Sequence, residues 1–175
     1  MVRGPEVACL QDMGPGRGMD YHIRHLALKQ IAQAFPLIRE YAQGISLDQW
    51  TQFAESVIGN KGAGDRTSAS GIVAAERLGY IRGLFSYAAL PDLRHERVLL
   101  VQDFNVVELV RRDTVSQLLL MEMSALARRL SCGAVHALLQ SESEWALLHF
   151  QRHGHQLQGT ALCRPLVQLP ASASV

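Results

Sequence analysis

The strongest constraint on the fold is a run of three strand-like segments between residues 71 and 107. Each is either a short apolar run or alternates apolar residues with others at the two-residue period of a β-strand. The segments are 72–75, 80–90 and 97–107, joined by Arg77-Leu78-Gly79 and by a charged turn at 91–96. Links this short join antiparallel neighbours, so the pattern predicts an antiparallel meander with a hairpin at 77–79.

A helix and another strand are predicted after the meander. Thr114 and Gln117 have the form of a capping box that opens the helix, and Gly133 is the expected stop. A strand at 134–139 follows, and a helix between two strands is the usual crossover of a parallel pair. The apolar stripe of this helix is Val115, Leu118, Leu119, Met123, Leu126 and Leu130.

Flanking segments complete an order of β, α, α, β, β, β, α, β, α, β. A strand is predicted at 20–26 and two helices at 28–43 and 46–58, with Pro36 kinking or splitting the first and Ser46 capping the second. A later helix runs from a second capping box at Ser141 to 153, and a last strand covers 160–166. The stripes of the first two helices are Leu28, Ile31, Ala32, Phe35 and Ile38, and Trp50, Phe53, Ala54, Val57 and Ile58. The fold class is therefore α+β: a mixed central sheet, antiparallel meander plus parallel crossover, flanked by about four helices.

Length and composition bound the remaining possibilities. The 175 residues suit one domain, predicted at 19–168 between flexible tails at 1–18 and 169–175. A net charge of +1 argues against an electrostatic nucleic-acid or membrane-surface partner. Three dispersed cysteines without a CxxC pair, and the lack of a long apolar run, predict a cytoplasmic protein. Residues 59–70 are predicted to form a flexible loop, and they lack the GK[ST] ending of a phosphate-binding P-loop.

Two local patterns connect this order of elements to a known family. The first is a strand end at Phe104-Asn105-Val106, a loop at Arg111–Ser116, and paired leucines at Leu119-Leu120. The second consists of Ala146, His149-Phe150 and Gly154-His155. Together they resemble the GNAT superfamily of acyl-CoA-dependent N-acyltransferases, over about residues 19–166.

The resemblance implies acetyl-CoA as cosubstrate and a place for it to bind. Backbone N–H groups at the start of the helix after the meander would hold the pyrophosphate, helped by the helix dipole. Pantetheine would pair with the strand edge near 104–107, opposite 134–139, and N–H groups near Val106 and Val107 would polarise the thioester. The implied cofactor-binding residues are Phe104, Val106, Val107, Arg111, Arg112, Asp113, Thr114, Val115, Ser116 and Phe150.

The sequence departs from the family pattern at the loop and at one helix. Thr114 and Ser116 replace the loop glycines, β-branched Thr114 disfavours a positive φ, and Asp113 adds negative charge beside the predicted anion site. Phe150 occupies the place of a proton-donating tyrosine, and it has no proton to donate. These departures leave open a second interpretation: a non-catalytic GNAT-like module that binds a ligand or a partner protein.

The resemblance does not identify the catalytic residues. Asp103, Glu108 and Glu76 are candidates for a general base near the splayed strand, and His149 or His153 for an acid. The acceptor would be an amine of a small molecule or of a peptide, and a homodimer is possible. His149 and His153 have the spacing of two metal ligands on one helix face. No nearby carboxylate completes such a site, so no metal is expected.

Overall fold

The computed structural model describes residues 21–59, 69–108, 110–140, 143–159 and 161–162. The predicted tails, most of the 59–70 loop and the last strand at 160–166 lie outside these residues, except that 161–162 are described and belong to no strand. The strands are β1 (His22–His25), β2 (Ser70–Arg77), β3 (Tyr80–Asp92), β4 (Glu96–Val106) and β5 (Ala134–Ala137). The helices are a short 3-10 turn (Leu28–Gln30), α1 (Ile31–Tyr41), α2 (Leu47–Ile58), α3 (Arg112–Arg129) and α4 (Glu144–Arg152).

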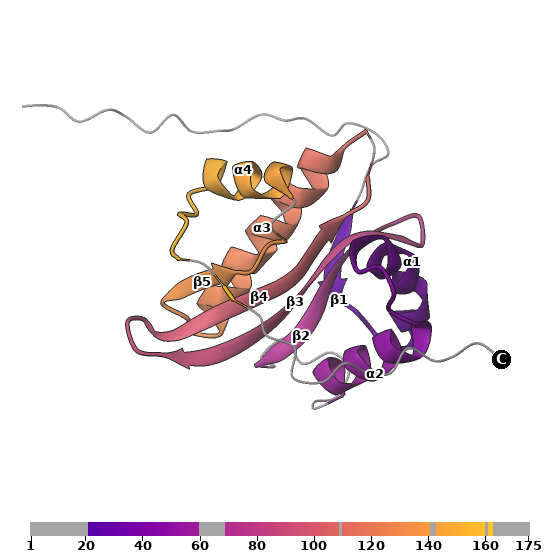
Figure 1. Cartoon of the computed structure of the whole chain (residues 1–175), viewed down its shortest axis with the longest axis horizontal. Coiled ribbons are helices and arrows are strands. Elements are labelled where there is room, and N and C mark those ends of the chain that lie inside the picture. The colour runs from indigo at the N-terminus through magenta and orange to yellow at the C-terminus, as the bar shows by residue number, and fades with distance from the viewer. Residues whose placement is uncertain (1–20, 60–68, 109, 141–142, 160, 163–175) are drawn as a thin grey trace, which may run out of the picture.

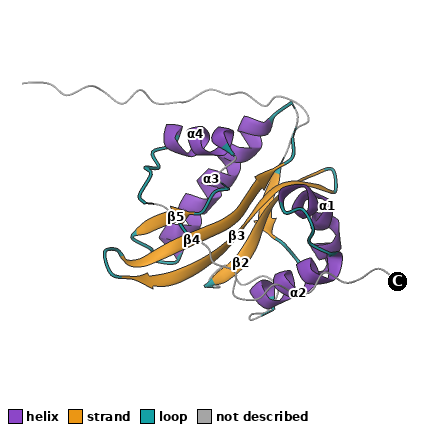
Figure 2. Ribbon diagram, in the orientation of Figure 1, coloured by secondary structure: helices purple, strands orange, loops and turns teal. Residues whose placement is uncertain are grey.

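The five strands form one mixed sheet in the order β1-β2-β3-β4-β5 (Figures 1 and 2). The first four strands are antiparallel, and β5 pairs parallel to β4 after the crossover through α3. The predicted hairpin is confirmed at Leu78 and Gly79, whose φ angles of 51° and 81° suit a two-residue turn with the right-handed strand twist. The predicted meander and the predicted crossover are therefore both confirmed.

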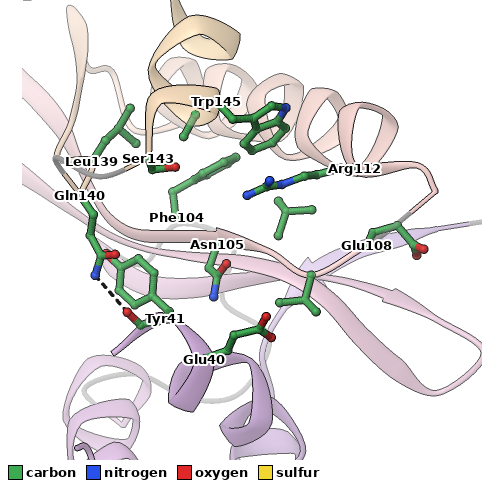
Figure 3. Close-up of a pocket in the computed structure, with 13 residues that line it drawn as sticks. Glu40, Tyr41, Phe104, Asn105, Glu108, Arg112, Leu139, Gln140, Ser143 and Trp145 are labelled. Carbon is green, nitrogen blue, oxygen red and sulfur yellow. Dashed lines mark hydrogen bonds between the residues drawn. The ribbon is translucent and has the colours of Figure 1, made fainter. Parts of the chain in front are cut away.

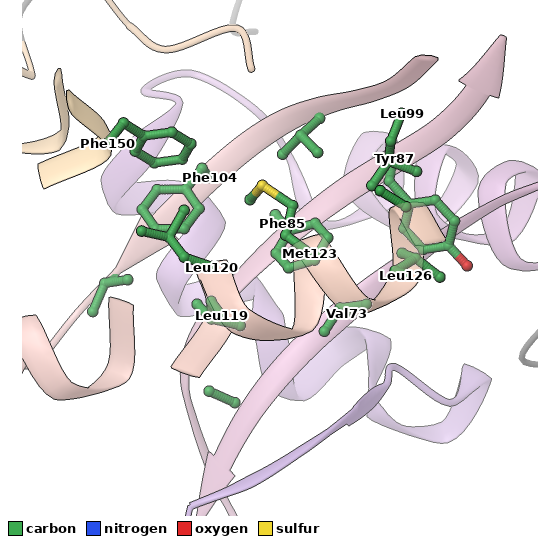
Figure 4. Close-up of a cluster of buried hydrophobic side chains, with 14 of the residues drawn as sticks. Val73, Phe85, Tyr87, Leu99, Phe104, Leu119, Leu120, Met123, Leu126 and Phe150 are labelled. Atoms are coloured by element: carbon green, nitrogen blue, oxygen red, sulfur yellow. The ribbon is translucent and has the colours of Figure 1, made fainter. Parts of the chain in front are cut away.

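Helices cover both faces of the sheet, α1 and α2 on one and α3 and α4 on the other (Figure 2). The larger apolar cluster lies between the sheet and α3, where Phe85, Leu119, Met123 and Leu126 are almost completely buried (Figure 4). A second cluster lies beneath α1 and α2 and includes Trp50. Among the described residues no helix is long and apolar enough to cross a lipid bilayer.

Two details of the first helices differ from the prediction. Pro36 does not split α1, which continues from Ile31 to Tyr41. The buried face of α1 is also displaced, because Ala34 and Leu37 face the sheet while Leu28 is half exposed. On α2 the Ser46 cap is confirmed, since its hydroxyl accepts from the Gln49 N–H and the Gln49 side-chain oxygen accepts from the Ser46 N–H.

The predicted ends of α3 and α4 were partly wrong. The cap of α3 is Arg111 rather than Thr114, so the helix starts a turn earlier than the capping-box pattern indicates. Ser131, with φ 54°, takes the left-handed position after α3 in place of Gly133, while Cys132 N–H bonds back to the Ala127 carbonyl. The cap of α4 is Ser143, whose side chain makes no capping bond, rather than Ser141.

Candidate functional site

The parallel strands β4 and β5 separate part-way along their length. They pair from Val98 with Ala134 to Val101 with Ala137, and the Leu138 N–H makes a last bond to the Val101 carbonyl at 2.9 Å. Strand β4 continues to Val106. Residues 102–106 therefore have no partner on β5, and the edge of β4 is left open toward that side of the sheet.

A β-bulge at Asp103 turns the open end of β4. Two residues of β4 oppose one residue of β3 here, and Asp103 has a φ of 53°. The extra residue shifts the alternation, so that Phe104 and Val106 join Val101 in the cluster beneath α3. The Asp103 carboxylate lies beside Ser86, whose hydroxyl donates to it at 2.5 Å. Without the bulge Phe104 would face α1 instead of α3.

The bulge can be tested through the backbone of Asp103. Asp103→Asn should keep nearly the full stability, because asparagine tolerates a positive φ. Asp103→Val should lower the free energy of unfolding by about 1–3 kcal/mol, because a β-branched residue is strained there. Urea denaturation measures both variants, and equal stability of the two would contradict a strained bulge at this position.

A cavity of about 400 Å³ occupies the fork between β4 and β5 (Figure 3). Four of the predicted cofactor residues line it: Phe104, Val106, Val107 and Arg112. The far wall was not predicted from the sequence; Glu40 and Tyr41 form it at the end of α1. The Gln140 side chain ties the loop after β5 to this wall by donating to the Tyr41 carbonyl at 3.1 Å.

The N-terminus of α3 lies at the cavity, where Arg112 belongs to its wall. The first N–H bonded inside the helix is that of Val115, which donates to the Arg111 carbonyl at 3.1 Å. The N–H groups of Arg112, Asp113 and Thr114 therefore have no partner within the helix, and these residues are exposed. Such a terminus attracts anions.

The replaced loop glycines are not required by this backbone. Thr114 and Ser116 lie within the helix, and neither has a positive φ. The steric objection to Thr114 therefore does not apply. Val115 and Ser116 are completely buried, and the Ser116 hydroxyl has no hydrogen-bond partner among the described residues.

The first turn of α4 contacts the first turn of α3 through Trp145. The indole Nε1 donates to Asp113 Oδ1 at 3.2 Å, and the Arg112 guanidinium carbon lies 3.8 Å from the ring centroid. His149 stacks on the indole with centroids 5.2 Å apart and an interplanar angle of 16°. His149 is buried, with Nδ1 3.9 Å from the Asp113 carboxylate and no hydrogen-bond partner for Nε2 among the described residues.

Burial lowers the pKa of His149 below the ordinary value, and the neighbouring His153 lowers it further, against the smaller opposing effect of Asp113. The unfolded chain therefore takes up a proton on His149 at a higher pH than the folded chain does. Unfolding free energy should fall as the pH drops from about 6.5, the ordinary histidine value, to the lower folded pKa. His149→Phe should reduce this slope in denaturant titrations between pH 7 and 5, and an unchanged slope would contradict the assignment.

Sequence comparison finds no match, since no protein-family model and no curated protein matches the chain. Solved structures do match. The aminoglycoside N-acetyltransferase AAC(6′)-Iy in complex with CoA has a TM-score of 0.72 at 15% identity, over 86% of this chain and 98% of that one. Glucosamine-6-phosphate N-acetyltransferase from Arabidopsis thaliana has a TM-score of 0.66 at 13% identity, over 85% and 99%. A transcriptional regulator from Bacillus halodurans C-125 has 0.69 at 11%, over 84% and 100%.

The chain has the GNAT fold. The mixed sheet, the α3 crossover and the four covering helices agree with the fold that the resemblance implied. Because the identities lie between 11% and 15% for these three structures, the likeness concerns the fold, and the reaction needs a separate argument.

The side chain of Phe150, one of the predicted cofactor-binding residues, lies in the core and not in the cavity. Phe150 is 2% exposed and packs edge-to-face on Phe104, with ring centroids 4.8 Å apart. It does not line the cavity.

The two N–H groups predicted to polarise the thioester point in different directions. The N–H of Val107 donates to the Arg82 carbonyl of β3 at 2.9 Å and is therefore occupied. Since alternate residues of a strand point their N–H groups to opposite sides, the Val106 N–H is directed toward the fork.

The three candidate bases lie in different places. Glu108 lines the cavity, accepts from the Tyr21 hydroxyl at 3.1 Å and has Arg82 Nε at 3.9 Å. Asp103 lies beneath the end of α1, where burial and this carboxylate raise the pKa of Tyr41. Glu76 is on β2, paired with Arg24 and outside the cavity wall.

The histidines of α4 do not come together with further metal ligands. Among the residues that the structure describes, no group of three or more His, Cys, Asp or Glu side chains could hold a metal ion. His149 instead stacks on Trp145 and makes a tilted ring contact with His153, whose ring centroid lies 4.5 Å away.

Proposed function

We propose that this protein transfers an acetyl group from acetyl-CoA to an amino group of a small molecule. The observation that carries the proposal is the fork between β4 and β5, with its cavity of about 400 Å³ beside the N-terminus of α3. A long thioester could lie in this fork, with its anionic end at the helix start and its acyl end near the wall formed by α1. The CoA complex of AAC(6′)-Iy shows that a protein of this fold binds CoA.

The residues at the start of α3 fit an anionic diphosphate. The N–H groups of Arg112, Asp113 and Thr114 supply donors, and the guanidinium groups of Arg111 and Arg112 supply positive charge. The open edge of β4 supplies backbone groups for the amides of pantetheine, and the Val106 N–H is a donor for the thioester oxygen. Acetyl-CoA provides the activated acyl group, and the protein orients it.

The carboxylates around the cavity fit the acceptor. Glu40 on the α1 wall and Glu108 just after β4 make the cavity acidic, which attracts an ammonium group before it loses its proton. Of the predicted bases, Glu108 is the residue that lines the cavity, and we propose that its carboxylate accepts the proton of the attacking nitrogen. Tyr41 also lines the cavity, and its phenol, which is protonated at neutral pH, is placed to donate to the departing thiolate.

Calorimetry with CoA and acetyl-CoA tests the binding part of the proposal. Both should bind to the full chain, and the absence of heat at millimolar ligand would overturn it. Turnover is then tested with acetyl-CoA and a panel of mono- and polyamines, by detecting the released thiol. Binding of CoA with no thiol release from any amine would favour the non-catalytic module, for which the buried and hydroxyl-free Phe150 is the supporting observation. A peptide acceptor and a homodimer stay predictions.

A further inference from the structure

Trp145 joins the two helices that meet at the mouth of the cavity. Its indole ring has three neighbours: Arg112 lies on one side, His149 stacks on the ring, and Asp113 accepts the Nε1–H bond. Both Arg112 and Trp145 line the cavity (Figure 3). His149 is buried and is not part of the cavity lining. In a chain with only 6% aromatic residues a tryptophan is expected in the core, yet Trp145 is only partly buried.

These contacts restrain an arginine that would otherwise be free. Arg112 is the first residue of α3 and is exposed, and within the described residues it makes no ion pair. A guanidinium resting on an indole gains a cation–π interaction, for which tryptophan is the best partner. Burial lowers the pKa of His149, which favours its neutral form at neutral pH and reduces like charge beside Arg112.

We propose that Trp145 is a positioning residue that holds Arg112 at the start of α3, ready for the diphosphate of CoA. This inference rests on the proposed function. The Nε1–H bond also engages the carboxylate of Asp113, the one negative charge in the first turn of α3. Trp145 therefore orders Arg112, whose positive charge favours a bound diphosphate, and restrains Asp113, whose negative charge disfavours it. This pair of contacts replaces the ordering that a tight glycine loop would provide.

The expected effect on affinity follows from the ordering of one side chain. Without the indole, Arg112 must lose its rotamer freedom when the ligand binds. This loss corresponds to about 2- to 12-fold weaker binding. Trp145→Ala should therefore raise the Kd for CoA by about this factor and raise KM for acetyl-CoA while kcat changes little. Trp145→Phe keeps a ring but loses the N–H, and an intermediate loss is expected.

A double-mutant cycle separates positioning from general structural damage. Calorimetry with CoA is carried out on the wild type, Trp145→Ala, Arg112→Ala and the double variant. If Trp145 acts through Arg112, Trp145→Ala should change the Kd much less in the Arg112→Ala background than in the wild type. Leu148→Ala, which truncates a half-exposed residue of the same helix, is the control and should leave the Kd unchanged.

Each outcome decides between alternatives. Full additivity of the two losses, or an unchanged Kd in Trp145→Ala, would overturn the positioning role while leaving the proposed function intact. Tighter binding in Trp145→Ala would also overturn it, because the Arg112–Trp145 pair would then be closing the cavity. A wild-type protein that binds no CoA would overturn both proposals. If thermal denaturation shows that Trp145→Ala does not fold, the cycle is run with Trp145→Phe.

Discussion

Arg111→Glu should weaken CoA binding by about 10- to 150-fold, the equivalent of losing a hydrogen bond between charged groups. Arg111 is the cap of α3, next to the three N–H groups of the first turn that have no partner within the helix. Reversing its charge places a carboxylate where the helix dipole and Arg112 would otherwise favour an anion. Together with Asp113, the substituted residue would give the helix start two negative charges. Calorimetry with CoA measures the change.

Arg128→Glu is the matched control for this reversal. Arg128 is also exposed and belongs to the same helix, but it lies in the last turn, far from the cavity. This variant changes the net charge by the same amount and should leave the Kd for CoA within about twofold, because exposed charges at this distance are screened. Equal losses in both variants would mean that only overall charge matters. No loss in Arg111→Glu would remove α3 from the proposed binding site.

Phe85→Ala should lower the free energy of unfolding by about 3–5 kcal/mol. Phe85 lies in β3, is completely buried and packs in the cluster beneath α3 (Figure 4). Truncation leaves a cavity that its neighbours on α3 and β4 can fill only partly. A domain of this size has a stability of only about 5–15 kcal/mol, so the variant should unfold at a markedly lower denaturant concentration.

Phe53→Ala gives the comparison for an aromatic residue that the sequence pattern also placed in a buried stripe. The Phe53 side chain is 40% exposed on α2, and its ring is near Trp50. Its truncation removes less buried area, so a loss of no more than about 1 kcal/mol is expected. Guanidinium denaturation of both variants checks the prediction. A loss from Phe53→Ala as large as that from Phe85→Ala would contradict the described core.

Much of the fold could be predicted because it depends on local patterns. The alternation in 80–90 and 97–107 reflects side chains on opposite faces of a strand, and Leu78-Gly79 supplies a turn residue that accepts a positive φ. The stripe from Val115 to Leu130 reflects one face of a helix packed on the sheet. The buried face of α1 was predicted wrongly, because apolar residues lie on several sides of that helix. Only the contact with the sheet decides which of them are buried.

Local sequence patterns were enough to predict the order of the elements from β1 to α4, the meander, the crossover and the basic residues at the start of α3. The tertiary structure decided the site. The bulge at Asp103 could not be predicted, because no glycine at this position signals a positive φ. The bulge turns Phe104 and Val106 toward α3. Glu40, Tyr41 and Trp145 reach the cavity from elements that are far apart in the chain. Periodicity records which face of an element is buried, but it does not record which other element covers that face. The fork and the Arg112–Trp145 contact arise only when the sheet and its helices pack together.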